Sequence, residues 1–184
     1  MDAHARSLLR VGAEPVRVRS AAALDGLDAL VLPGGESTTI AKGLARLQLY
    51  EPLRAFVREG RPVLGTCAGA ILLARGSKNH PVETLGAIDA TAVRNAYGTQ
   101  VDSFATLVDP GGEPSLSGLR CVFIRAPHLC DLGPEVEVLA RVDGRPVLVR
   151  QGRVLAATFH PELTGDARVH ALLMDDSLPL GSAS

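Results

Sequence analysis

The strongest constraint on the fold is a segment in which an apolar strand runs into small residues around a cysteine. Residues 61–64 read Arg-Pro-Val-Leu, residues 65–69 read Gly-Thr-Cys-Ala-Gly, and residues 70–74 continue as Ala-Ile-Leu-Leu-Ala. Small residues on both sides of a nucleophile are typical of the tight turn between a buried parallel strand and the helix that follows. The segment therefore predicts an α/β protein with Cys67 at the end of a central strand.

Cys67 itself is the main candidate for catalysis. The tight turn exposes the sulfur, and the N-terminus of the following helix favours its thiolate form. The backbone N–H of Ala68 then points to the place where an oxyanion would form. The alternative is a buried structural cysteine, which is common for this residue type but does not require flanking glycines.

The remaining elements alternate between strand and helix before the chain becomes rich in strands. This order predicts a three-layer α/β sandwich around a mostly parallel sheet, with an antiparallel extension late in the chain. One domain over residues 1–176 accounts for the length, and the Pro-, Gly- and Ser-rich residues 177–184 predict a flexible C-terminal tail. We expect helices over 2–11, from Ser37 or Thr38 to about Gln48, after Pro52 and over 165–174, and strands over 15–18, 28–32, 61–66, 87–94, 103–108, 119–125, 136–142, 146–150 and 153–159.

Composition excludes several classes of function. The 19 basic and 20 acidic residues form no basic stripe, and aromatic residues make up only 3%, so a nucleic-acid partner is not expected. No apolar run reaches the roughly 20 residues of a membrane span, and no signal peptide is evident. The three cysteines are too few and too widely spaced for a disulfide framework or a cysteine-rich zinc site. We therefore expect a cytoplasmic protein with no membrane partner, metal or cofactor.

A thiolate nucleophile needs a base, and His160 is well placed to be one. It follows the apolar strand 153–159, and ligand sites of open α/β sheets lie at the carboxyl ends of strands. Glu162 lies two residues further on, and in an extended segment both side chains point the same way. Glu162 can therefore orient the imidazole, which completes a Cys-His-Glu triad.

The other histidines give weaker signals. His128 is two residues from Cys130, but two candidate ligands without a second pair do not make a metal site. His170 is expected on the solvent face of the last helix. His4 and His80 carry no pattern, and Cys121 belongs to a predicted core strand.

Two further features lie at the same predicted edge of the sheet. Gly34 and Gly35 precede a helix, an arrangement that lets backbone N–H groups approach a ligand but that also suits an ordinary turn. The phosphate-loop pattern is absent. Arg94 and Arg125 each follow an apolar strand, where an arginine can bind a carboxylate with two hydrogen bonds or can simply lie on the surface.

Taken together, these segments resemble the glutaminase subunit of pyridoxal 5′-phosphate synthase, a class I (triad-type) glutamine amidotransferase. The resemblance covers about residues 12–173. The cysteine turn and the His-Pro-Glu motif are shared by the whole class. The strings Gly-Gly-Glu-Ser-Thr-Thr, Arg-Asn-Ala-Tyr-Gly and Ile-Arg-Ala-Pro, which begin at residues 34, 94 and 124, are specific to this subfamily.

The resemblance implies a role for each matching residue. Cys67 would attack the side-chain amide of L-glutamine, with His160 transferring protons and Glu162 orienting it. The N–H groups of Gly35 and Ala68 would form the oxyanion hole. The residues implied in glutamine binding are Gly35, Glu36, Ser37, Arg94, Ile124 and Arg125.

The resemblance also implies a partner. Ammonia would pass into a (β/α)8-barrel synthase subunit that builds pyridoxal 5′-phosphate, and the glutaminase would be weak until that subunit docks.

Two departures from the family pattern limit these implications. The family begins with an apolar strand and a Gln-Gly turn that this sequence lacks, so we expect a sheet without that first strand, and Thr99 stands where the family usually has arginine. Two alternatives therefore stay open: a catalytically weak or silent subunit that only docks the synthase, and a stand-alone α/β hydrolase with a cysteine turn.

Overall fold

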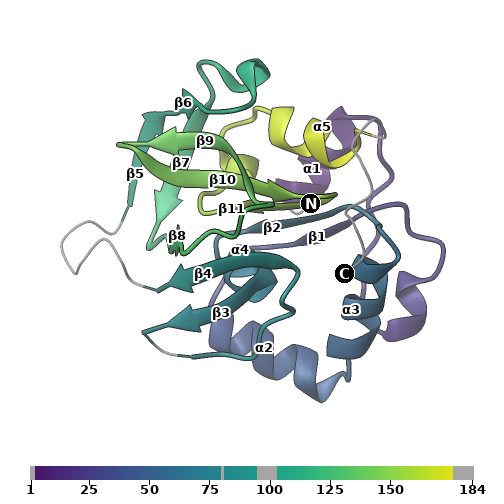
Figure 1. Ribbon diagram of the computed structural model, residues 1–184. Coiled ribbons are helices and arrows are strands. Elements are labelled where there is room, and N and C mark those ends of the chain that lie inside the picture. The colour runs from purple at the N-terminus through teal and green to yellow at the C-terminus, as the bar shows by residue number, and fades with distance from the viewer. Residues whose placement is uncertain (1–2, 80, 95–102, 176–184) are drawn as a thin grey trace.

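The computed structural model describes residues 3–79, 81–94 and 103–175 of the chain. A six-stranded sheet lies at its centre, with helices on both sides (Figure 1). In spatial order its strands are β1 (Leu30–Leu32), β2 (Val63–Thr66), β11 (Val154–Ala157), β10 (Arg145–Gln151), β9 (Glu137–Val142) and β6 (Asp109–Pro110).

This sheet has a parallel part and an antiparallel part. Strands β1, β2 and β11 run parallel, with Leu32 opposite Gly65 and Ala157 opposite Thr66. Strands β10, β9 and β6 add to them in antiparallel pairs. The arrangement matches the predicted α/β sandwich with an antiparallel extension, and the parallel part brings three strand ends to one edge.

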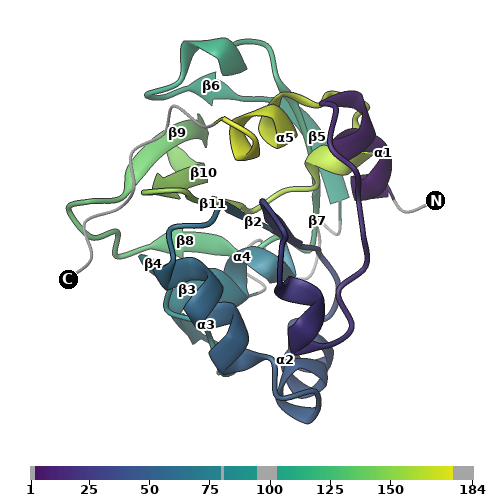
Figure 2. The same cartoon turned by 90° about the vertical axis from the view of Figure 1, so that its right-hand side faces the viewer.

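Helices and two smaller sheets cover the two faces of the central sheet (Figure 2). One side carries α2 (Ser37–Arg46), α3 (Tyr50–Arg58), α4 (Ala68–Leu73) and the sheet of β3 (Ala74–Lys78), β4 (Ile88–Val93) and β8 (His128–Cys130). The other side carries α1 (Ala3–Arg10), α5 (Arg168–Leu173) and the pair β5 (Ser103–Leu107) and β7 (Arg120–Ile124). Three short 3-10 turns connect these elements: η1 (Ala21–Leu24), η2 (Pro114–Leu116) and η3 (Pro161–Leu163).

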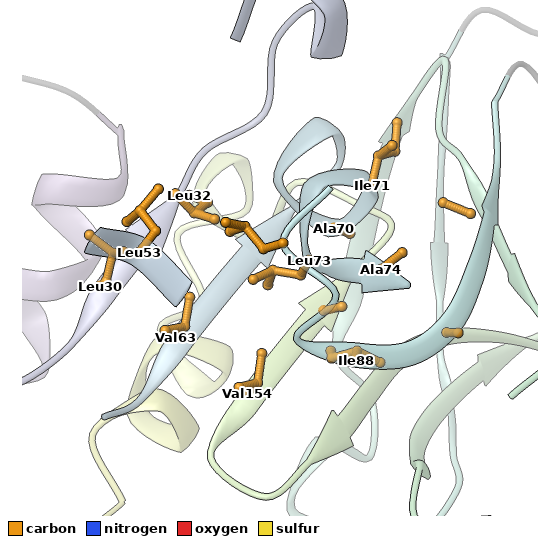
Figure 3. Packing of buried hydrophobic residues seen from close by; sticks show 14 of the residues in the cluster. Leu30, Leu32, Leu53, Val63, Ala70, Ile71, Leu73, Ala74, Ile88 and Val154 are labelled. Atoms are coloured by element: carbon orange, nitrogen blue, oxygen red, sulfur yellow. The ribbon is translucent and has the colours of Figure 1, made fainter. Parts of the chain in front are cut away.

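Each face of the sheet buries its own core, because successive side chains of a strand point to opposite faces. Leu64 and Leu155 point toward α5, where they belong to the same buried cluster as Val169. Figure 3 shows the core on the opposite face, which is built from strand ends, α3 and α4. Its members include Leu30, Leu32, Leu53, Val63, Leu73 and Val154.

Several predicted elements differ from the observed ones. Residues 15–18 form no strand, because Pro15 has no backbone N–H to donate and Val16 is 60% exposed, so that only Val18 packs against the core. Strand β3 was missed because its sequence, Ala-Arg-Gly-Ser-Lys, has no apolar alternation. Helix α3 begins at Tyr50, so Pro52 lies within its first turn, where a missing N–H is tolerated. His80, Thr99 and the predicted tail, residues 177–184, lie outside the described residues.

Two glycines allow α4 to pack directly on the parallel strands. A Cβ atom on Gly69 would overlap the carbonyl group of Leu32, at the end of β1. A Cβ atom on Gly65 would lie 2.5 Å from Leu73 Cδ1 and 2.6 Å from the backbone carbonyl of Gly69. The small residues that flank Cys67 in the sequence are therefore required by the approach of helix, strand and turn.

This contact predicts the effect of adding one methyl group. Gly69→Ala should lower the free energy of unfolding by about 1–3 kcal/mol, because the neighbouring atoms are backbone and cannot move aside cheaply. The matched control is Gly43→Ala in α2, where an added Cβ meets open space and alanine favours the helix by about 0.5–1 kcal/mol. Urea unfolding of both variants checks this, and equal stability of the two would contradict the packing argument.

Candidate active site

The parallel strands bring Cys67 and His160 to the same edge of the sheet. Cys67 follows β2 directly, and its backbone N–H donates to the carbonyl oxygen of Ala157 in β11 at 2.8 Å. His160 follows β11 by three residues, and its N–H donates to the carbonyl oxygen of Val122 in β7 at 2.8 Å. Both side chains therefore start from backbone positions that the sheets fix.

Cys67 occupies a strained turn. Its φ of 50° and ψ of −106° lie in a region that residues with a side chain rarely adopt, at a typical cost of about 1–3 kcal/mol. The Sγ atom lies 3.9 Å from the carbonyl oxygen of Ile124, and the residue is 7% exposed. The sharp turn predicted from the sequence is present, and such strain is typical of nucleophiles at a strand-to-helix turn. The expectation that the turn exposes the sulfur is wrong, because Cys67 is buried at the base of the turn.

His160 and Glu162 form a close, largely buried pair. The Nδ1 atom of His160 lies 2.8 Å from Oε1 of Glu162, and the two side chains are 13% and 8% exposed. Glu162 is held by η3, which begins directly after His160. With Nδ1 occupied by the carboxylate, the other ring nitrogen is left for Cys67.

The surroundings of the imidazole change its pKa. Burial alone would lower the pKa of His160, but hydrogen bonds with Cys67 and Glu162 outweigh it and raise the pKa to about 9. For Glu162, burial would raise the pKa, but the hydrogen bond with His160 and the field of His4 hold it below its usual value. The site therefore favours an imidazolium beside the sulfur and a carboxylate behind it.

Gly34 explains how the cysteine and the imidazole can be neighbours. A Cβ atom at this position would lie 2.5 Å from His160 Cε1 and 3.3 Å from Cys67 Cβ. Only a residue without a side chain fits between the two. Gly35, the next residue, has a φ of 147°, which favours glycine as well.

A cleft of about 210 Å³ opens over Cys67. This is smaller than the roughly 300–1,000 Å³ of sites for drug-sized ligands and suits a molecule of amino-acid size. Glu162 lies behind His160 rather than in the cleft. Ile71 and Pro127 also line the cleft, although neither was predicted from the sequence. The predicted residues that the structure brings together around the cleft are Gly35, Glu36, Ser37, Cys67, Ala68, Arg94, Ile124, Arg125 and His160.

Two charged residues in this cleft already bind each other. The Nη2 atom of Arg94 donates to Oε1 of Glu36 at 3.0 Å. The Glu36 carboxylate also caps α2 by accepting from the N–H groups of Thr38 and Thr39, and these hydrogen bonds lower the pKa of Glu36 to about 2. Arg94 is therefore held at the mouth of the cleft beside a fixed negative charge.

Two histidines lie elsewhere than the sequence analysis expected. His170 is fully buried, so the prediction that it lies on the solvent face of α5 is wrong. His4, which carried no sequence pattern, is 6% exposed and lies behind Glu162, with 3.4 Å between Nε2 and Oε2. Isolated histidines in short amphipathic helices give no periodic signal that distinguishes a buried position, which explains both omissions.

Among the described residues, Cys121, Cys130 and His128 form no further metal or catalytic site. Cys121 lies in the core as predicted, and burial raises the pKa of its thiol well above the usual range. Cys130 contacts the carboxylate of Asp131, and His128 lies beside Arg145. Within residues 3–79, 81–94 and 103–175, no cluster of three or more His, Cys, Asp or Glu side chains could hold a metal ion. No helix in these ranges is both long and apolar enough to cross a bilayer.

A cysteine on a strained turn beside a histidine–glutamate pair, at the carboxyl edge of parallel strands, is the arrangement of cysteine-dependent enzymes that attack an amide or ester carbonyl. Comparison with known proteins narrows this class. The model of the SNO glutamine amidotransferase family matches residues 1–178. The chain belongs to this family.

Individual relatives agree with this assignment. A Frankia alni protein named pyridoxal 5′-phosphate synthase subunit PdxT is 54% identical over 176 residues, which cover 94% of this chain and 87% of that protein. A Thermotoga maritima protein of the same name is 46% identical over 175 residues, covering 94% and 91%. A crystal structure described as a glutamine amidotransferase superposes with a TM-score of 0.87 at 46% identity, covering 94% of this chain and 90% of that one.

The pKa of His160 provides a direct test of the site's electrostatics. NMR titration of the histidine ring protons should find His160 near 9 and His128 below 6.5, since burial and Arg145 lower the pKa of His128. Glu162→Gln should lower the pKa of His160 by about one unit or more, because a neutral amide stabilises the imidazolium less. His128 is the internal control and should not move.

The same shift fixes the pH range in which the pair stabilises the fold. Because the folded-state pKa of His160 is raised from 6.5 to about 9, its contribution is complete below pH 6.5 and is lost as the pH rises through 9. A His160 resonance that titrates near 6.5 and ignores Glu162→Gln would contradict this description.

Proposed function

We propose that this chain hydrolyses L-glutamine to glutamate and ammonia and supplies the ammonia to a synthase subunit that makes pyridoxal 5′-phosphate, in vitamin B6 biosynthesis. The observation that carries the proposal is the Cys67 turn with the His160–Glu162 pair beside it, at the base of an amino-acid-sized cleft. Membership of a glutamine amidotransferase family supports glutamine as substrate. The names of the relatives support the synthase as the destination of ammonia.

The reaction proceeds through a thioester. The Cys67 thiolate attacks the side-chain carbonyl carbon of glutamine, and the negative charge that forms on oxygen is stabilised by the N–H groups of Gly35 and Ala68. The imidazolium of His160 donates a proton to the nitrogen, the C–N bond breaks, and ammonia leaves. His160 then removes a proton from water, which attacks the thioester and releases glutamate. Glu162 keeps the imidazole in the required tautomer throughout.

The polar groups at the mouth of the cleft hold the other end of glutamine. Its α-amino group carries a positive charge that the Glu36 carboxylate, ionised far below neutral pH, can bind. Its α-carboxylate can bind Arg94 and Arg125 through charge-assisted hydrogen bonds, with Ser37 and Ile124 lining the remaining wall. The side-chain amide then extends toward Cys67 at the base.

Ammonia would be lost to water without a partner that covers the cleft. The sequence resemblance implies that the synthase subunit is a (β/α)8 barrel. Its docking over the cleft would both shelter ammonia from water and complete the oxyanion hole. Glutaminase activity is therefore expected to depend on the partner.

Release of ammonia from glutamine tests the proposal. The wild-type chain should release ammonia when mixed with a synthase subunit from a close relative, and much less alone. Cys67→Ala should lower turnover by at least about 10³-fold while keeping the fold, since no other group supplies the nucleophile. The matched control is Cys130→Ala, which lies outside the cleft and should keep wild-type turnover. Docking without ammonia would favour a silent subunit, and neither docking nor ammonia would favour an unrelated hydrolase; either result contradicts the proposal.

Arg94 should affect binding more than chemistry. Arg94→Ala removes a charge-assisted hydrogen bond to a part of glutamine that does not react, so KM should rise about 10- to 100-fold while kcat changes little. The control is Arg75→Ala, because Arg75 pairs with Asp89 on the neighbouring sheet and does not line the cleft. Steady-state kinetics with the synthase present measures both, and a loss confined to kcat would remove Arg94 from substrate binding.

A further inference from the structure

A line of buried polar side chains continues behind Glu162, away from the cleft. Glu162 uses Oε1 for His160, and its Oε2 faces Nε2 of His4 at 3.4 Å. The other nitrogen of His4, Nδ1, lies 3.0 Å from Nε2 of His170, and His4 Nε2 also lies 3.1 Å from the hydroxyl of Thr66. His170 and Thr66 are fully buried, so these groups are shielded from water.

The charge on Glu162 decides how His4 is protonated. If Nε2 carried no proton, its lone pair would face a buried carboxylate, which is unfavourable in a medium of low dielectric constant. With a proton on Nε2, His4 donates toward Glu162 and Thr66. Burial, followed by the field of His4, lowers the pKa of His170 to about 4, so His170 is neutral at physiological pH and shares one proton with Nδ1 of His4. When the neutral His170 ring donates from Nε2 to Nδ1 of His4, the single proton of a neutral His4 ring lies on Nε2, on the side of Glu162 and Thr66.

His4 is held in this position by its helix. Helix α1 lies beside η3 and α5 in both views of the molecule (Figures 1 and 2). At the other end of α1, the guanidinium of Arg10 donates to the carbonyl oxygen of Gly165, in the loop between η3 and α5. The helix is therefore fixed at both ends to the segment that carries Glu162.

We propose that His4 is a positioning residue for the hydrolysis proposed above: it holds the second oxygen of Glu162, so that Oε1 stays directed at His160 and the imidazole stays directed at Cys67. Glu162 Oε2 is buried and accepts no hydrogen bond among the described residues, so the ion-pair contact with Nε2 of His4 at 3.4 Å is the interaction that can hold it. Without His4, the carboxylate is free to rotate about its side-chain bonds, and the imidazole loses its fixed orientation. His4 is not among the residues that line the cleft, so its effect passes through Glu162.

The reactivity of Cys67 gives a test that does not depend on glutamine. Alkylation of Cys67 by iodoacetamide at one mildly alkaline pH, followed by mass spectrometry of its peptide, reports how well His160 supports the thiolate, with Cys130 as the internal reference. His4→Ala should slow alkylation of Cys67 roughly tenfold relative to Cys130. His4→Gln, whose amide can donate to Glu162 from nearly the same place as Nε2, should restore most of the rate.

Two further variants separate positioning from loss of stability. Ser7→Ala alters the same helix at a residue that is 2% exposed, and it should leave the alkylation rate unchanged. In a Glu162→Gln background, His4→Ala should cause little further loss, because an effect that passes through Glu162 disappears with it. In complex with the synthase, His4→Ala should lower kcat for glutamine with KM unchanged.

The outcomes divide clearly. The positioning role would be overturned if His4→Ala alkylated Cys67 at the wild-type rate, or if Ser7→Ala slowed alkylation as much as His4→Ala does. It would also be overturned if His4→Ala slowed alkylation as strongly in the Glu162→Gln background as in the wild type. If the alkylation pattern is as expected but the wild-type complex releases no ammonia from glutamine, the positioning role stands and the proposed function fails.

Discussion

The parallel pairing of β2 with β1 and β11 is the constraint on which the site depends. It fixes the relative height of three strand ends, so that the turn with Cys67 and the segment with His160 leave the sheet side by side. The pairing is secured by apolar side chains on both faces and by glycines at the closest contacts. A shift of one residue in either pair would move the sulfur and the imidazole apart and turn the core side chains to the wrong face.

The local costs of the site are carried by this rigid frame. The cysteine backbone is strained, the imidazole and the carboxylate are largely buried, and three glycines, Gly34, Gly65 and Gly69, stand where a side chain would collide with a neighbouring segment. Each feature is unfavourable alone. Together they bring a sulfur, an imidazole and a carboxylate into hydrogen-bonding contact, which favours the charged forms of the last two. The stability of the surrounding core therefore offsets the free-energy cost of a reactive site at one edge of the central sheet.

Local patterns made the central part of this site predictable. Three separate signals are visible in the sequence. Cys67 stands between small residues, His160 and Glu162 follow an apolar strand, and two adjacent glycines precede a helix. Strand β3 carries no such signal, because its sequence shows no apolar alternation. It forms a strand because it pairs with β4. The burial of His4 and His170 was also unpredictable, since it depends on the docking of α1 against the distant segment 161–173, and helix periodicity cannot reveal which distant segment covers a histidine.

The central claim is that Cys67 itself forms a bond with glutamine. The most direct test is to stop the wild-type complex with acid during turnover and to measure the mass of the peptide that contains Cys67. The account predicts a fraction of this peptide heavier by one γ-glutamyl group, bound as a thioester that hydroxylamine removes. Ammonia release with Cys67 unmodified throughout, or with the adduct on Cys130 instead, would contradict it.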